Sequence, residues 1–231
     1  MQRMAAIPIS STSIGKKVLM ALSSIVLFLY VVGHLVGNLK IFFGPDPFND
    51  YAEWLRVAGS PLFPDEGLLW IARVILLAAL FVHVGVYVQL WRQKRRARTV
   101  GYRTFDPQVF SWMSRAMMWG GLAILLFVIF HVLHLTTGHI TPDPAAGFQR
   151  HDPYENIIAG FSLWWVSGIY VIGVLALGMH LYHGLWSGMQ TLGMNNPKYN
   201  LYRRPAAAVV AIVIAVGYIA IPLGVLFGMV S

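Results

Sequence analysis

The chain alternates between long apolar stretches and short polar connections. Five stretches reach the length of about 20 residues that a helix needs to cross a bilayer core; they cover residues 18–39, 68–91, 117–137, 157–189 and 206–230. Each is predicted to be a helix, because an open strand would leave its backbone polar groups unpaired in lipid. The fourth stretch is the longest, so we expect part of it to tilt or to lie at the membrane surface. The pattern predicts an all-α integral membrane bundle of five transmembrane helices that forms a single domain over residues 1–231.

Composition supports a membrane protein. Hydrophobic residues make up 57% of the chain and charged residues 11%, whereas soluble domains have about 25% charged residues. The chain has no cysteine, which excludes thiolate ligands, disulfides and cysteine-bound iron–sulfur clusters within it. The net charge of +8 is attributed to basic connections on one side of a membrane, not to nucleic-acid binding.

The basic residues are distributed unevenly between the two sides. The N-terminal segment and the connections 90–115 and 190–205 hold 13 of the 17 Lys and Arg residues but only one acid, Asp106. The positive-inside rule therefore predicts a cytoplasmic N-terminus and an outside C-terminus, in a multi-pass protein of the cell inner (cytoplasmic) membrane. The first stretch follows Lys16 and Lys17, but it is too long for the core of a signal peptide and no cleavage site follows it, so we expect a retained helix.

Histidines are concentrated inside the predicted spans. Two of the eight, His139 and His151, belong to the connection 138–156. The other six lie in the first four spans: His34, His83, His131, His134, His180 and His183. A single histidine in a membrane helix often only packs against a neighbour and donates one hydrogen bond. Polar groups at membrane depth are costly and mark functional positions, and four consecutive helices each carry at least one.

Depth sorts four of these histidines into two layers. His34 and His131 lie 17 and 16 residues beyond the basic residues that precede their stretches, roughly 25 Å above the basic edge. His83 and His180 lie nine and ten residues before the polar ends of theirs, roughly 13 Å above that edge. Two facing histidines in each layer are what two stacked b-type haems require, and an iron with two axial imidazoles transfers electrons without binding oxygen.

Glycines flank these histidines and would let a flat macrocycle approach the backbone: Gly33, Gly37, Gly85, Gly184 and Gly188. Small residues also serve helix–helix packing, so this support is weak by itself.

Other interpretations fit less well. Membrane di-iron desaturases have a similar number of histidines, but their motifs cluster on one side of the membrane, whereas the two His-x-x-His pairs here lie in different layers. A proton-coupled transporter usually adds a carboxylate within the membrane, and none of the nine acids lies in a span. A purely structural bundle does not explain the layers.

Four motifs resemble a known family. They are GHLVGNL (33–39), FVHVGVYVQLW (81–91), VIFHVLHL (128–135) and MHLYHGLWSGMQTLG (179–193). Across nearly the whole chain, the sequence resembles the single-chain, five-helix, two-haem cytochrome b subunit that anchors succinate dehydrogenase and fumarate reductase. The resemblance implies that the first histidine of each His-x-x-His pair is the axial iron ligand. It thus implies His34 with His131 for the outer haem and His83 with His180 for the inner haem, the same pairing as depth gives.

The roles of the second histidines stay open. His134 and His183 could contact a haem propionate or a quinone, or could simply pack. Outer polar residues such as His139, Asp152 and Glu155 could relay protons, but we expect most of them to be ordinary residues of a solvated loop.

The resemblance also implies cofactors and partners. The expected cofactors are two haem b, with a membrane quinone, expected to be menaquinone, as substrate. The expected partners are a flavoprotein and an iron–sulfur subunit on the cytoplasmic face, and membrane lipid. The run RQKRRAR (92–98) suits an acidic partner or anionic headgroups, or only sets topology. The resemblance implies that the chain belongs to an enzyme complex of the tricarboxylic acid cycle. The chain has no catalytic residue for dicarboxylate chemistry, so that catalysis is expected in a partner. The sequence does not distinguish succinate oxidation from fumarate reduction. The alternatives are the anchor of a hydrogenase or formate dehydrogenase, or a haem-free transporter.

Overall fold

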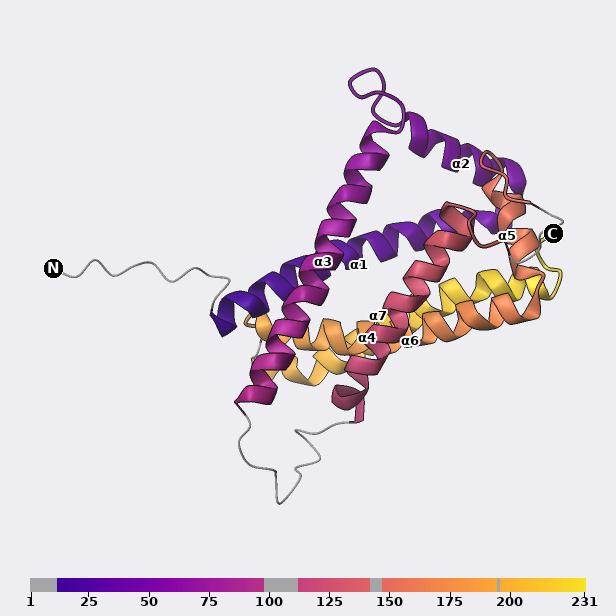
Figure 1. Ribbon diagram of the computed structural model, residues 1–231. Helices are drawn as coiled ribbons and strands as arrows, with labels where there is room; N and C mark the ends of the chain where they lie inside the picture. The colour runs from indigo at the N-terminus through magenta and orange to yellow at the C-terminus, as the bar shows by residue number, and fades with distance from the viewer. Residues whose placement is uncertain (1–11, 98–111, 142–146, 195) are drawn as a thin grey trace.

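The protein is entirely helical in the part that the structure describes. The computed structural model describes residues 12–97, 112–141, 147–194 and 196–231, with the side chains of 112–116 left out. Its elements in chain order are α1 (Ser13–Asn38), η2 (Leu39–Phe43), α2 (Pro45–Val57), α3 (Gly67–Arg96), α4 (Trp112–His131), η3 (Val132–Thr136), α5 (Pro153–Phe161), α6 (Trp164–Thr191) and α7 (Pro197–Leu226) (Figure 1).

Five of the described segments are long and apolar enough to cross a membrane. They are Ser13–Phe43, Gly67–Arg96, Met117–Thr136, Trp164–Thr191 and Pro197–Leu226. Most side chains along them are not buried by other parts of the chain, as expected for helices whose outer faces meet lipid. The predictions of an all-α bundle and of a multi-pass membrane protein are confirmed at this level.

The fourth predicted span, 157–189, is wrong at its beginning. The chain turns between α5 and α6, where Leu163 adopts an extended backbone conformation. The Ser167 hydroxyl donates to the carbonyl of Phe161 at 2.7 Å and satisfies one backbone group at this break. Residues 157–161 therefore belong to the short helix α5, and the spanning helix begins at Trp164. Hydropathy did not reveal the break, because both flanking segments are apolar and contribute to the same buried core.

Two other elements differ from the sequence prediction. The fifth span was expected from residue 206 to 230, but α7 runs from Pro197 to Leu226. Asn196 caps its first turn through the backbone N–H of Lys198, and Pro205 lies within the helix. Helix α2 was not predicted, since it is short and mixes polar with apolar residues.

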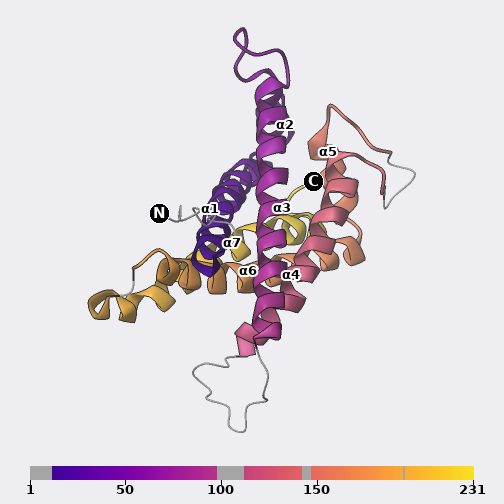
Figure 2. The same ribbon diagram turned by 60° about the vertical axis from the view of Figure 1, so that its left-hand side comes forward.

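The long helices form a bundle in which not every neighbour packs closely. Helices α6 and α7 form the most extensive pair, and α1 contacts both of them. Helix α3 packs along α1, and α4 packs along α6. In both views α3 crosses the direction of α6 and α7 at a large angle (Figures 1 and 2). Helices α2 and α5 contact each other and lie with the C-terminus at one end of the bundle (Figure 1).

A hydrophobic core forms at the end of the bundle that α2 and α5 cover. It joins η2, α2, α5, α6 and α7 through Ile41, Phe48, Tyr154, Ile157, Phe161, Val166, Tyr170, Ile221, Val225 and Val230. The short helices are thus fixed to the spanning helices by buried apolar contacts.

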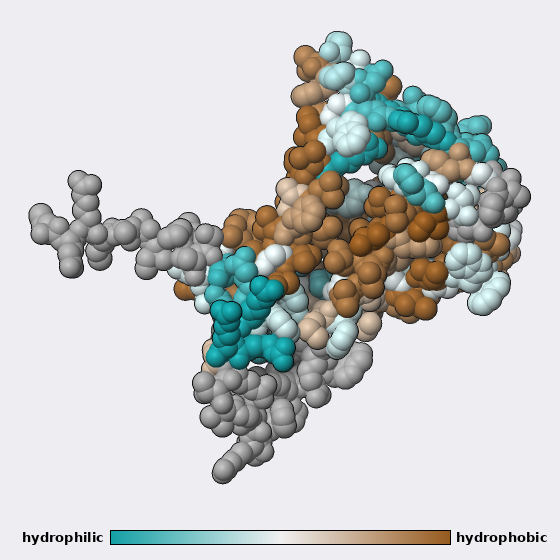
Figure 3. Space-filling model, in the orientation of Figure 1, coloured by the Kyte–Doolittle hydropathy of each residue, from teal (hydrophilic) through white to brown (hydrophobic). Residues whose placement is uncertain are grey.

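Charge and hydropathy divide the surface along the bundle. Apolar residues cover the visible sides of the long helices, and hydrophilic residues gather over α2 at one end and over the last turns of α3 at the other (Figure 3). The beginnings of α1 and α7 and the end of α3 lie opposite α2 and α5 (Figure 1). The described basic residues at these helix ends are Lys16, Lys17, Arg92, Lys94, Arg95, Arg96, Lys198, Arg203 and Arg204. The basic side predicted from the sequence also includes Arg3, Arg98, Arg103 and Asp106, which lie outside the described residues, and Arg115, whose side chain is not described. The side of the membrane that this basic end faces stays a prediction.

Candidate functional site

Two histidine pairs meet inside the bundle. His34 of α1 and His131 of α4 have ring centres 5.9 Å apart, with ring planes at 81°. His83 of α3 and His180 of α6 have ring centres 6.0 Å apart, with ring planes at 63°. The structure thus brings together the four histidines that were predicted to pair, in the predicted combinations. Their function as iron ligands stays a prediction.

The separation of the rings fits two imidazoles on opposite sides of one metal ion. An imidazole nitrogen binds a metal at about 2.0–2.1 Å, and the ring centre lies roughly 1.1 Å behind that nitrogen, so the two centres would be about 6 Å apart. The observed separations are 5.9 and 6.0 Å. The angles between the ring planes are also compatible, because two rings bound to one iron can each turn about the axis that joins them. The residues present therefore fit two axially ligated haems.

Each histidine pair spans two helices that do not pack along each other. Among the described residues, extended packing joins α1 to α3 and α4 to α6, but not α1 to α4 or α3 to α6. The side chains of each pair therefore meet across a space between separated backbones. A flat group that takes one ligand on each face would need such a separation, because its two faces would point toward the helices that supply these ligands.

Glycines near the pairs differ in what surrounds them. A Cβ atom added to Gly33, Gly85, Gly184 or Gly188 would meet no atom within 4 Å beyond the local helix backbone. These four positions border space that protein atoms do not fill, but so do Gly120, Gly121 and Gly168, so the approach of a macrocycle stays a prediction. Gly37 differs, since a Cβ there would lie 2.5 Å from the ring of Tyr51. The absence of a side chain at Gly37 instead lets Tyr51 of α2 pack against α1.

The Nδ1 atoms of the four rings have different surroundings. Those of His131 and His180 are buried and have no hydrogen-bond partner. Burying a polar atom without a partner costs about 1–3 kcal/mol, and a metal bound through Nε2 would not remove this cost. The Nδ1 atom of His83 lies 3.2 Å from the Ser24 hydroxyl.

Asn38 holds the fourth ring, that of His34. The Asn38 amide donates to the carbonyl of His34 at 2.6 Å and lies 3.2 Å from its Nδ1. Coordination through Nε2 requires the proton on Nδ1, so the contact between this amide and Nδ1 has to give way when a metal binds. Ser24 and Asn38 were not predicted from the sequence. The only available signal was a polar residue within an apolar span.

The side chain of His134 is buried and contacts other parts of the protein. The residue is 4% exposed, and its Nδ1 lies 2.9 Å from the hydroxyl of Tyr170. A Cβ on Gly160 would lie 2.7 Å from its ring atoms, so α5 closes over the ring. The π-helical segment Val132–Thr136 begins directly after His131, so regular α-helical spacing does not continue from His131 to His134. Of the two roles considered for His134, these contacts favour packing.

His183 lies between the inner histidine pair and the basic end of the bundle. Its ring is 5.7 Å from that of Trp186 at an angle of 89°, and the guanidinium of Arg204 lies 4.3 Å above the Trp186 ring. The Nδ1 atom of His183 is buried without a hydrogen-bond partner. A polar ligand for His183 therefore stays a prediction, whereas Trp186 has a defined cation–π contact.

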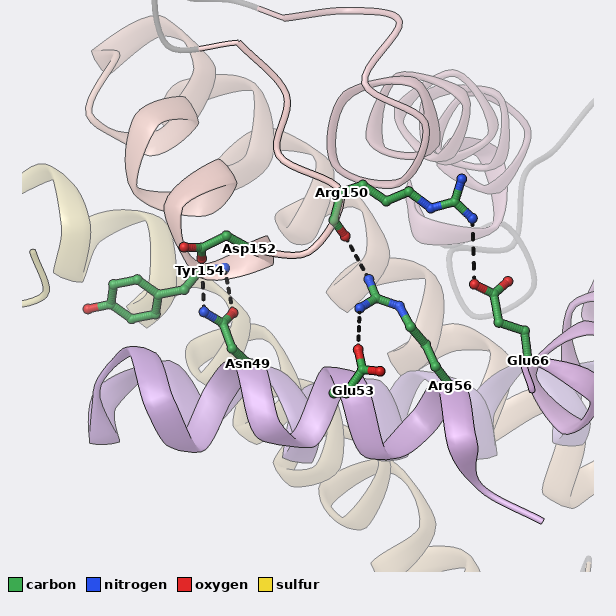
Figure 4. Close-up of polar contacts among 7 residues, drawn as sticks. All are labelled: Asn49, Glu53, Arg56, Glu66, Arg150, Asp152 and Tyr154. Carbon is green, nitrogen blue, oxygen red and sulfur yellow. Dashed lines mark hydrogen bonds and ion pairs between the residues drawn. The ribbon is translucent and has the colours of Figure 1, made fainter. Parts of the chain in front are cut away.

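The polar residues at the end of the bundle that α2 and α5 cover form a structural network. Asn49 of α2 donates to a carboxylate oxygen of Asp152 at 2.9 Å, and the backbone N–H of Tyr154 donates to Asn49 at 3.1 Å (Figure 4). The same Asp152 oxygen caps the first turn of α5. Arg56 donates to the carbonyl of Arg150 at 2.7 Å (Figure 4). Asp152 thus fixes α5 to α2, and the expectation that most of these loop residues do not relay protons stays a prediction.

Histidines meet in pairs rather than in larger clusters. Within the described ranges, no group of three or more His, Cys, Asp or Glu side chains could hold a metal ion by itself. A di-iron centre needs such a group, whereas a haem brings four nitrogen ligands of its own and needs only two from the protein.

Comparison with known proteins adds no family assignment. No protein-family model, curated protein or solved structure matches the chain. The interpretation of the site therefore depends on the two histidine pairs, and that of the family on the four sequence motifs.

Proposed function

We propose that this chain is the dihaem cytochrome b membrane anchor of a succinate:quinone oxidoreductase. The observation that carries the proposal is the presence of two histidine pairs, each with a separation of about 6 Å, between helices that do not pack along each other. The identity of the partner enzyme is supported by the resemblance of the four motifs to the anchor subunit of succinate dehydrogenase and fumarate reductase.

In this proposal each residue of the two pairs has a defined task. His34 and His131 hold the outer haem, and His83 and His180 hold the inner haem. When bound, the two haems supply one-electron transfer through irons that have no free coordination position. The apolar side chains of the spanning helices exclude water from the irons. The chain itself performs no dicarboxylate chemistry, which belongs to a flavoprotein partner.

The basic end of the bundle is proposed to be the docking side. An iron–sulfur subunit would bind there on the cytoplasmic face, because a positive surface attracts an acidic partner. The inner pair, His83 and His180, is the nearer of the two pairs to this end. The haem that His83 and His180 would hold is therefore proposed to supply one-electron transfer on the side of the partner, and a membrane quinone is proposed as the substrate of the complex.

Haem content tests the proposal directly. The full chain, expressed in membranes and purified in detergent, should give two haems b per chain in a pyridine haemochrome assay. His139→Ala is a suitable control, since this exposed histidine lies outside the predicted spans and its loss should leave both haems in place. A chain that contains no haem when haem is supplied during expression would refute the proposal.

The partner enzyme needs a separate test. Purification from the native membrane should yield a flavoprotein and an iron–sulfur protein, and succinate should reduce the haems of that complex. Two haems together with hydrogenase or formate dehydrogenase subunits would retain the cytochrome and replace the dehydrogenase.

A further inference from the structure

Ser24 connects α1 to one of the proposed iron ligands. Its hydroxyl oxygen lies 2.7 Å from the carbonyl oxygen of Met20, one turn earlier in α1. The same oxygen lies 3.2 Å from Nδ1 of His83, on the neighbouring helix α3. Helices α1 and α3 pack along each other, so this contact belongs to a close helix–helix interface.

The chemistry of the three groups fixes the direction of both hydrogen bonds. A carbonyl oxygen can only accept, and a serine hydroxyl has a single hydrogen to donate. The hydroxyl of Ser24 therefore donates to Met20, and a lone pair of its oxygen faces His83. The hydrogen in the second contact has to come from the imidazole, so Nδ1 of His83 carries the proton.

This tautomer leaves Nε2 of His83 with its lone pair free. Neutral imidazole has one protonated and one unprotonated nitrogen, and the unprotonated nitrogen binds a metal. The hydrogen bond made by the other nitrogen fixes the tautomer and orients the ring. Ser24 thus prepares His83 for coordination through Nε2.

The same support is not found at the other three candidate ligands. The Nδ1 atoms of His131 and His180 have no hydrogen-bond partner. The Nδ1 atom of His34 lies beside the amide nitrogen of Asn38, which is a donor. Within the described part of the chain, His83 therefore differs from the other three in having an acceptor for an Nδ1 proton.

We propose that Ser24 is a positioning residue that sets the tautomer of His83 and lowers the reduction potential of the inner haem. The inference rests on the proposed function, since it requires that His83 ligates iron. An acceptor on Nδ1 draws the proton away from the ring and makes Nε2 a stronger electron donor. A stronger donor stabilises the oxidised iron more than the reduced iron.

The size of the effect follows from the type of hydrogen bond. A neutral hydrogen bond of ordinary strength changes an equilibrium by up to about tenfold. We therefore expect Ser24→Ala to change the ratio of oxidised to reduced inner haem, at a fixed potential, by up to about tenfold in favour of the reduced form. For a one-electron couple, a tenfold change corresponds to about 59 mV.

The neighbouring serine provides a matched control. The hydroxyl of Ser23 also donates to the carbonyl of Met20, at 3.0 Å, and its contacts do not include His83. Ser23→Ala therefore removes the same kind of group and the same kind of bond from the same turn of α1. Ser24→Thr keeps a hydroxyl at the position that contacts His83.

The experiment is a redox titration of the purified full chain with its haems, followed by absorption and electron paramagnetic resonance. Ser24→Ala should raise the midpoint potential of the inner haem and leave the outer haem unchanged, while Ser23→Ala and Ser24→Thr should titrate like the wild type. Selective loss of the inner haem in Ser24→Ala, with retention in Ser24→Thr, would equally support the positioning role.

Three results would overturn the inference. They are an unchanged inner potential in Ser24→Ala, an equal shift in Ser23→Ala, and a Ser24→Thr variant that behaves like Ser24→Ala. A wild-type chain without haem would instead refute the proposed function. The two failures are therefore distinguishable.

Discussion

The two histidines of the third spanning segment should respond differently to the same substitution. In the structure, the ring of His131 faces that of His34 at 5.9 Å, and its Nδ1 has no hydrogen-bond partner. The residue His134 is only 4% exposed, and its Nδ1 forms a hydrogen bond of 2.9 Å with the hydroxyl of Tyr170. His131→Ala should therefore remove the outer haem, whereas His134→Ala should weaken the fold and keep both haems.

The magnitudes follow from these contacts. In His131→Ala the haem content should fall from two to one per chain, and no hydrogen bond within the protein is lost at Nδ1. In His134→Ala the buried hydroxyl of Tyr170 loses its partner, which costs about 1–3 kcal/mol. The space left by the ring adds to this cost, because the surrounding residues relax only in part.

The assay combines haem content with stability for each purified variant. Pyridine haemochrome measurements give the number of haems, and thermal unfolding in detergent gives the stability. Tyr170→Phe is the matched control, since it removes the same hydrogen bond from the other side and should lower stability while keeping both haems. Loss of one haem in His134→Ala together with two haems in His131→Ala would show that the ligand on this helix has been wrongly assigned.

Three further predictions concern the inner haem, the α5 contact and the topology. His83→Ala or His180→Ala should remove the inner haem alone and, in the assembled complex, stop reduction of the outer haem by succinate; rapid reduction of the outer haem in such a variant, measured by difference spectra, would contradict the proposed electron path. Gly160→Ala should destabilise the chain by about 1–3 kcal/mol in thermal unfolding, since its Cβ would lie 2.7 Å from the ring of His134; unchanged stability would contradict the close contact. A reporter fused after Ser231 should be active only outside the cytoplasm, and a cytoplasmic signal would contradict the proposed orientation.

Several features of this protein are determined by the sequence alone. About 20 apolar residues in succession are enough to specify a spanning helix, because the cost of exposing them to water and the need to pair the backbone in lipid act on each segment separately. Helical rise then converts a position along the chain into a depth. For that reason the pairing of His34 with His131 and of His83 with His180 could be predicted, and the structure brings both pairs together.

Other features depend on tertiary contacts. The break before Trp164, the early beginning of α7 and the presence of α2 were missed, because hydropathy reports how apolar a segment is and not where its backbone turns.

The rotation of each helix about its own axis could not be predicted from the sequence either. A helix that is apolar on all sides carries no periodic signal for the face that turns inward. The structure was needed to show that His134 turns toward Tyr170. It also showed that Ser24 meets His83 across 59 positions in the chain. Such contacts depend on how two helices cross and rotate against each other, which is decided by packing over the whole bundle.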